Sequence, residues 1–215
     1  MGEFVHLHLH TEYSLLDGAT RIKNIAQNSI ECGQDAVAIT DHGVMYGVVE
    51  FYEEMKMNGI KPIIGCEVYV APRSRALKEG KSDSSGDHLI LLCKNEIGYK
   101  NLCYMVSESH INGFYLRPRI DMELLTSHHE GLIALSACLS GRIPRLILSG
   151  AIAEAEAEAL RMKDLFGEDF YLEIQNHHMN EESRVAFGLK TISQKFGIPL
   201  VANEKASSSS KLCPV

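Results

Sequence analysis

The sequence predicts an α/β protein whose strands form a parallel sheet, and three observations carry this prediction. Short apolar runs typical of strands, such as Ala36–Thr40 and Phe170–Gln175, recur along the chain. Stretches with apolar residues at helical spacing, such as 21–32, separate them. Histidine and acidic residues, which can bind metal or act as acids and bases, follow several of the apolar runs. Strands that alternate with helices form βα units, and about seven strands in one chain favour a barrel over an open sheet.

The first half of the chain sets this alternation. Strands are expected at 4–10 and 36–40, and residues 61–70 are expected to form a strand pair interrupted by Gly65. The spacing of Ile22, Ile25 and Ile30 predicts a helix over 21–32, which Gly33 can end. The same pattern predicts a helix over 47–58. The polar stretch 71–87, rich in Ser, Gly, Lys and Arg, is expected to be a mobile surface loop.

The second half of the chain continues the same order without a repeat of fixed period. The apolar patterns predict strands over 88–93, 131–136, 170–175 and 198–202, and helices over 97–109, 142–148, 151–166 and 181–196. The acidic residues of the Ala- and Glu-rich helix at 151–166 are expected to face solvent.

Length and composition describe an ordinary globular domain and exclude several classes of protein. The 215 residues are 45% hydrophobic and 23% charged, which is enough for a substantial core. The net charge of -7 argues against nucleic-acid binding by bulk electrostatics, although a local basic patch over a metal site remains compatible with it. Neither a membrane span nor a signal peptide is expected. The six cysteines are scattered without a disulfide-like framework, which predicts a cytoplasmic protein with reduced thiols.

Three histidines near the N-terminus form the strongest chemical signal. In an extended strand, successive side chains alternate between faces, so His6, His8 and His10 are expected on one face. Imidazole is the commonest protein metal ligand, and Asp17 can add a carboxylate just beyond the strand. The alternative is a solvent-facing edge strand that happens to be rich in histidine.

Other candidates lie at or near predicted strand ends, the edge that carries the active site in (β/α) barrels. His42 follows the strand at 36–40, and Glu67 lies among apolar residues, where a carboxylate must be paired, hydrogen-bonded or bound to metal unless it faces solvent. Cys138 is either a thiolate ligand or a small apolar side chain. His88 is the exception because it begins its strand, so that strand runs differently from the others or its boundary is misplaced. The segment Arg117-Pro118-Arg119 can contact phosphate, but a solvated loop is the favoured interpretation.

Histidines, carboxylates and a thiol at separate strand ends are the usual composition of a multinuclear metal site. Zn, Mn or Fe fits such nitrogen and oxygen ligands better than Ca or Mg. Two or three close metal ions clamp a phosphate ester and activate water near neutral pH, so the first chemical hypothesis is phosphoester hydrolysis.

These residues resemble the polymerase-and-histidinol-phosphatase (PHP) superfamily. The similarity begins with three segments: His8-Leu9-His10-Thr11, Thr40-Asp41-His42-Gly43 and Gly65-Cys66-Glu67. Further stretches, such as those at 4–18, 59–67, 88–96 and 135–141, are similar to the PHP domains of bacterial DNA polymerase III alpha subunits. The resemblance runs from about residue 3 to residue 203.

The resemblance implies a distorted, TIM-like (β/α)7 PHP barrel that holds two or three divalent metal ions. The metal ligands it implies are His8, His10, Asp17, His42, Glu67, His88 and Cys138. In some members the domain is a metal-dependent 3′–5′ exonuclease that proofreads for the polymerase, and in others it is a structural platform. The implied partners are a DNA 3′ end and the remaining polymerase domains or replisome subunits, with no membrane.

The end of the sequence departs from the family pattern. The family places Asn-Asp-x-His-Tyr after the last strand, but this chain has Asn203-Glu204-Lys205-Ala206. We therefore expect a C-terminally truncated PHP barrel over 1–203 and an atypical Ser-rich tail over 204–215. The expected function is phosphodiester hydrolysis of the proofreading type. The alternatives are a non-catalytic, metal-stabilised docking module of the polymerase and a stand-alone PHP-family phosphatase.

Overall fold

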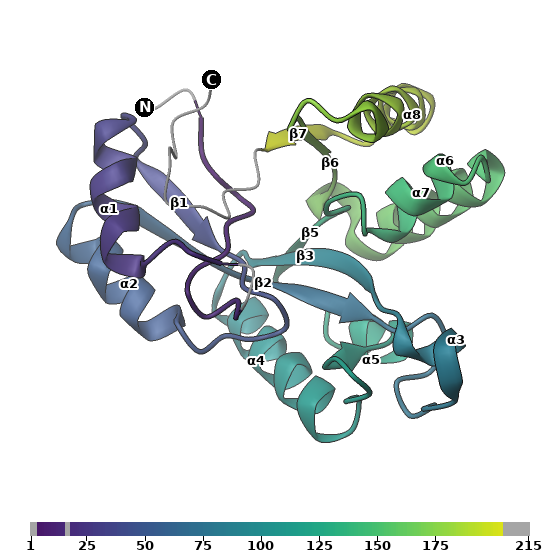
Figure 1. Ribbon diagram of the computed structural model, residues 1–215, viewed down its shortest axis with the longest axis horizontal. Helices are drawn as coiled ribbons and strands as arrows, with labels where there is room; N and C mark the ends of the chain where they lie inside the picture. The colour runs from purple at the N-terminus through teal and green to yellow at the C-terminus, as the bar shows by residue number, and fades with distance from the viewer. Residues whose placement is uncertain (1–3, 16–17, 204–215) are drawn as a thin grey trace.

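A curled sheet with helices packed around it forms the fold (Figure 1). The computed structural model describes residues 4–15 and 18–203. The strands are β1 (Ala36–Ile39), β2 (Lys61–Val70), β3 (Asp87–Cys93), β4 (Arg119–Ile120), β5 (Leu132–Leu135), β6 (Phe170–Gln175) and β7 (Leu200–Asn203). The helices are α1 (Ile22–Glu31), α2 (Val48–Met57), α3 (Gly80–Ser84), α4 (Glu96–Ile111), α5 (Met122–Ser127), α6 (Arg142–Leu148), α7 (Ile152–Phe166) and α8 (Asn180–Phe196), with a short 3-10 turn at Gly167–Asp169.

The sheet is mixed, which corrects the expectation of a wholly parallel one. Its order is β1-β2-β3-β5-β6-β7, and the short strand β4 pairs with β2. All pairings are parallel except those of β3, which runs antiparallel to both β2 and β5. The reversal explains why His88 begins its strand: His88 lies opposite Tyr69, near the carboxyl end of β2. Of the two alternatives for His88, a strand that runs differently from the others is therefore the correct one.

Residues 4–10 were expected to form a strand. They lie beside β1 and are joined to it by isolated hydrogen bonds, without a regular β-ladder. The Ala38 amide donates to the His6 carbonyl, and the Thr40 amide donates to the Leu9 carbonyl. On the other side, the Leu7 amide donates to Asn203 Oδ1 of β7 over 3.3 Å. This N-terminal segment therefore contacts the two outermost strands of the curled sheet.

Residues 61–70 form one continuous strand, not the expected pair interrupted by Gly65. The first half of β2 pairs with β1, and the second half pairs with β3. A Cβ at Gly65 would lie 2.6 Å from the Leu91 carbonyl oxygen, so glycine permits the close approach of β3 at the point where the partner changes.

The stretch 71–87 is organised around one buried side chain, contrary to the expectation of a mobile loop. The Arg119 guanidinium is fully buried and donates to the carbonyls of Asp83, Leu77 and Arg75 within this stretch. Asp83 also pairs with Arg73 at 2.7 Å. The interpretation of Arg119 as part of a solvated loop is therefore wrong, because burying a guanidinium requires the partners that this stretch supplies.

Apolar packing divides the sheet into an outer and an inner face. Outward side chains of β2 and β3, such as Cys66 and Leu91, pack with α4 to α8 in the largest hydrophobic cluster. A second cluster lies under α1 and α2, around Phe51. The inner face carries a smaller apolar cluster that includes Ile90 and Leu135. Because side chains alternate along a strand, Glu67 points inward between the outward Cys66 and Val68. No helix in the described parts of the chain has both the length and the apolar character to cross a bilayer.

Candidate metal centre

Four imidazoles gather around the carboxylate of Glu67 on the inner face of the sheet. Glu67 is fully buried, which excludes the alternative that it faces solvent. His8 and His10 come from the N-terminal segment, and the backbone of His42 forms a parallel bridge with Glu67. His88 reaches the carboxylate from the neighbouring antiparallel strand. Side chains from positions as far apart as His8 and His88 thus meet at one carboxylate.

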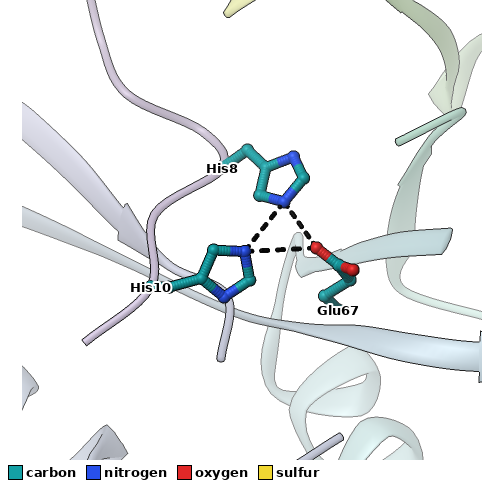
Figure 2. Close-up of side chains that lie close together, drawn as sticks. All are labelled: His8, His10 and Glu67. Atoms are coloured by element: carbon teal, nitrogen blue, oxygen red, sulfur yellow. Dashed lines mark hydrogen bonds and ion pairs between the residues drawn. The ribbon is translucent and has the colours of Figure 1, made fainter. Parts of the chain in front are cut away.

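The first half of this cluster is a triangle of ligand atoms (Figure 2). His8 Nε2 lies 2.5 Å from Glu67 Oε2 and 3.1 Å from His10 Nε2, and His10 Nε2 lies 3.2 Å from Glu67 Oε2. All three side chains are fully buried. Of the three histidines expected on one face, His8 and His10 meet at Glu67. The buried His6 is not part of either group with ligand spacing among the described residues, and it packs edge-on against Phe4, with ring centroids 4.9 Å apart.

The second half of the cluster uses the other oxygen of the same carboxylate. Glu67 Oε1 faces His42 Nδ1 at 3.3 Å and contacts His88 Nδ1. These three residues form a second group with the spacing of metal ligands. Glu67 therefore presents one oxygen to each of two imidazole pairs.

The donor atoms fit one or more divalent cations. Ligand atoms about 2.0–2.1 Å from a tetrahedral ion lie roughly 3.3 Å apart, which is close to most of the separations in this cluster. Neutral imidazole and carboxylate are the ligands that Zn, Mn and Fe share. Glu67 Oε1 is buried, and its described neighbours are the imidazole nitrogens of His42 and His88, which are themselves candidate ligands.

The protonation of the cluster follows from burial and from the two nearby carboxylates. Burial lowers the pKa of His8, but the carboxylates of Glu173 and Glu67 outweigh it and raise this pKa to about 10. Burial lowers the pKa of His10 to about 3. Burial opposes ionisation of Glu67, but the histidines hold its pKa well below its usual range. His10 is thus neutral, the form in which imidazole binds metal.

Glu173 is a buried residue that sequence analysis missed. His8 Nδ1 donates to Glu173 Oε1 over 2.9 Å, and Gln175 and Asn203 side chains donate to the same oxygen at 2.6 and 3.2 Å. Such a carboxylate orients a metal-binding histidine and fixes its tautomer. The signal that could have found Glu173 is the one that singled out Glu67: a carboxylate within an apolar strand.

Asp41 supports the cluster from the other side. It accepts hydrogen bonds from Thr11 N at 2.6 Å and from Ser14 Oγ at 2.6 Å, and Ser14 Oγ lies 3.1 Å from His10 Nδ1. Burial raises the pKa of Asp41 above its ordinary value, although these hydrogen bonds oppose the shift. Asp41 therefore positions the chain around His10.

Two of the residues implied as ligands are not brought into either group. Cys138 Sγ lies 3.6 Å from His88 Nδ1, at the edge of the cluster. Within the described residues, the two groups with ligand spacing do not include Cys138. Asp17 lies outside the residues that the structure describes.

The protein has a curled α/β sheet of the barrel type. Buried imidazole and carboxylate side chains on the inner face of this sheet form a candidate metal centre. The chain belongs to the PHP domain family, whose profile matches residues 6–177. The fold agrees with this assignment. A metal-dependent phosphoesterase from Bifidobacterium adolescentis matches with a TM-score of 0.62 at 13% identity, over 98% of this chain and 90% of that one. An amidohydrolase from Chromobacterium violaceum matches with a TM-score of 0.57 at 14% identity, over 94% of this chain and 87% of that one.

Sequence relatives narrow the similarity to one group of proteins. The chain is 49% identical to DNA polymerase III subunit alpha of Borreliella burgdorferi over 94% of its length. It is 48% identical to that of Treponema pallidum over 92%, and 45% identical to that of Thermus aquaticus over 93%. The chain spans only 17–18% of the length of these three relatives.

Proposed function

We propose that this chain is the PHP domain of a bacterial DNA polymerase III alpha subunit and acts in DNA replication in the cytoplasm. The 45–49% identity to three such subunits over more than nine-tenths of the chain supports this proposal. Its partners are then the other polymerase domains or replisome subunits and the 3′ end of a DNA strand.

The proposed reaction is metal-dependent hydrolysis of a phosphodiester bond, of the 3′–5′ exonuclease type. One observation carries it: Glu67 faces His8 and His10 with Oε2, and His42 and His88 with Oε1. A carboxylate with an imidazole pair on each oxygen is suited to hold two neighbouring ions, the arrangement used for in-line displacement at phosphorus. The proposed ligands are His8, His10, Asp17, His42, Glu67, His88 and Cys138.

In this proposed reaction, the side chains of the protein hold and orient the metal ligands. Two or three bound Zn, Mn or Fe ions would supply Lewis acidity and activate water. Glu173 holds the His8 ring through Nδ1, which turns Nε2 toward Glu67. Ser14 contacts His10 Nδ1 in the same manner, leaving Nε2 toward the centre. These contacts orient both rings so that each presents Nε2 to the same place.

Manganese-dependent trimming of a 3′-labelled DNA strand tests the proposed reaction. The purified chain is expected to shorten the strand, and both His8→Ala and His10→Ala are expected to abolish shortening. His128→Ala, which changes a histidine beyond α5, is the matched control and should retain activity. Equal trimming by the wild-type chain and both site variants would show that the activity comes from a contaminant.

A second candidate function is a non-catalytic module in which metal stabilises the domain for docking. The complete burial of His8, His10 and Glu67 favours it, because ions there would join the N-terminal segment to β2. Ions that bind only the folded chain raise its stability by mass action. This candidate predicts that a chelator lowers the melting temperature while the metal-loaded chain trims no DNA.

A further inference from the structure

The loop between α4 and β4, residues 112–118, packs against the turn that carries His42. His110 Nε2, at the end of α4, lies 2.9 Å from the Gly43 carbonyl oxygen. A Cβ at Gly43 would lie 2.7 Å from Pro118 Cγ, so Pro118 sits directly on this glycine. The loop is therefore held at the rim of the candidate metal centre.

Arg117 extends from this loop over the ring of Tyr69. The guanidinium carbon lies 5.0 Å from the ring centroid, a cation–π contact. Tyr69 follows Glu67 by two residues on β2, so both side chains point to the same face of the sheet. The Tyr69 ring meets the His88 ring edge-on, with centroids 5.0 Å apart, and lies 6.2 Å from the His42 ring. Tyr69 thus contacts both Arg117 and two imidazoles of the cluster.

The guanidinium of Arg117 differs from those of the other arginines in its contacts. In the described parts of the chain, every other arginine forms an ion pair or a hydrogen bond with protein oxygen: Arg21, Arg73, Arg75, Arg119, Arg142, Arg145, Arg161 and Arg184. Arg117 is exposed, and its described contact is with the Tyr69 ring. An aromatic ring orients a guanidinium without neutralising it, so all five N–H donors stay available.

We propose that Arg117 binds a phosphate group of the substrate beside the metal centre, a role that rests on the proposed function. A guanidinium matches two phosphate oxygens with two parallel hydrogen bonds. The chain as a whole carries a charge of -7, so attraction of an anionic strand depends on local positive charge, which bound metal ions and nearby basic side chains would supply together. Arg117 supplies that charge at the rim, and Tyr69 holds it there. The ligand class is a nucleotide phosphate or the terminal phosphodiester of a DNA strand.

Binding of thymidine 5′-monophosphate to the full chain loaded with Mn²⁺ tests this proposal without requiring turnover. The paramagnetic ion broadens the ³¹P signal of the bound nucleotide, so titration gives the dissociation constant. Arg117→Ala is expected to weaken binding by about tenfold or more, the loss typical of a charge-assisted hydrogen bond. Arg117→Lys should recover part of the affinity, because it keeps the charge but not the planar fork.

Arg184→Ala is the matched control, because it removes the same charge from α8. It should leave the dissociation constant unchanged, and all variants should bind the same amount of Mn²⁺. Equal affinity of Arg117→Ala and the wild-type chain, or no nucleotide binding by the wild-type chain, overturns the proposal. Loss of Mn²⁺ from Arg117→Ala also overturns it, since Arg117 would then stabilise the centre. Arg117-dependent binding by a chain that trims no DNA supports this role and contradicts only the proposed hydrolysis.

Discussion

His8 Nδ1 lies 2.9 Å from Glu173 Oε1, although the two residues are 165 positions apart in the chain. This contact joins the N-terminal segment to β6 across the inner face of the sheet. It leaves His8 Nε2 toward Glu67, 2.5 Å away. Glu173 therefore acts on the centre through the orientation and basicity of His8.

Glu173→Gln is expected to lower metal affinity without removing a proposed ligand. Loss of a carboxylate that orients a ligating histidine typically costs about 10–100-fold in affinity. Competition between the protein and a chromophoric chelator measures this change. Glu181→Gln, an exposed substitution on α8, is the control and should bind metal like the wild-type chain. Equal affinity of Glu173→Gln and the wild-type chain would mean that Glu173 only fills the core.

Glu67→Gln and His88→Ala are expected to differ in how many ions they remove. Glu67 belongs to both groups of ligand atoms, so Glu67→Gln should lose all bound metal. His88 belongs only to the group on Oε1, so His88→Ala should keep the ion held by His8 and His10. Elemental analysis of protein purified without chelator gives the metal content per chain. Retention of every ion by Glu67→Gln would refute the bridging role, and His128→Ala controls for handling losses.

The order of the longer strands and helices from α1 onward could be predicted from local sequence, whereas the short elements α3, β4 and α5 were not predicted. The direction of β3 could not, because a strand pattern with a period of two is the same in both directions. His88 at the start of β3 was the local sign of the reversal. The role of Arg119 depends on partners far along the chain, and no local pattern contains that information. The partner of Glu173, His8, is also distant, although the position of Glu173 within an apolar strand is a local signal. Glu67 was found because an acid among apolar residues requires a partner, and the same test applied to β6 would have found Glu173.

Gly43→Ala is expected to destabilise the protein more than Gly59→Ala. Both glycines have positive φ, +63° and +73°, so each alanine carries backbone strain of about 1 kcal/mol. A Cβ at Gly59 meets nothing within 4 Å, whereas one at Gly43 lies 2.7 Å from Pro118 Cγ. Overpacking of this kind adds about 1–3 kcal/mol to the loss in unfolding free energy. Urea unfolding measures both variants, and equal losses would show that Pro118 moves aside freely.

Arg119→Met is expected to release the stretch 71–87 from the domain. The guanidinium donates to four backbone carbonyl oxygens: those of Asp83, Arg75, Leu77 and Gly113. Methionine fills similar space but donates no hydrogen bond, so the loss in unfolding free energy should exceed about 3 kcal/mol. Trypsin should then cut at Lys78 and Lys81 sooner than in the wild-type chain. Arg161→Met, a half-exposed change on α7, is the control, and cleavage at the wild-type rate in Arg119→Met would contradict this role.

Asp121→Asn tests how acid destabilises the same region. Asp121 caps α5 by accepting from the Leu124 amide at 3.0 Å, and it accepts from the Arg75 amide and side chain at 2.8 and 2.7 Å. Burial raises the pKa of Asp121, but these hydrogen bonds and the Arg75 charge outweigh it and hold the pKa below its ordinary value. A group with a lowered pKa in the folded state contributes stability above its unfolded pKa and loses it as the pH falls through the folded value.

The unfolding free energy of Asp121→Asn should therefore be lower than that of the wild-type chain near pH 7, by about 1–2 kcal/mol for the lost cap and charge. The difference should shrink as the pH falls below about 4, the ordinary range for aspartate, because protonation removes the same interactions from the wild-type chain. Urea unfolding between pH 3 and pH 7 gives both curves. Asp164→Asn, an exposed change on α7, should run parallel to the wild-type curve. A difference between Asp121→Asn and wild type that stays constant over this range would show that the Asp121 charge contributes nothing beyond its shape.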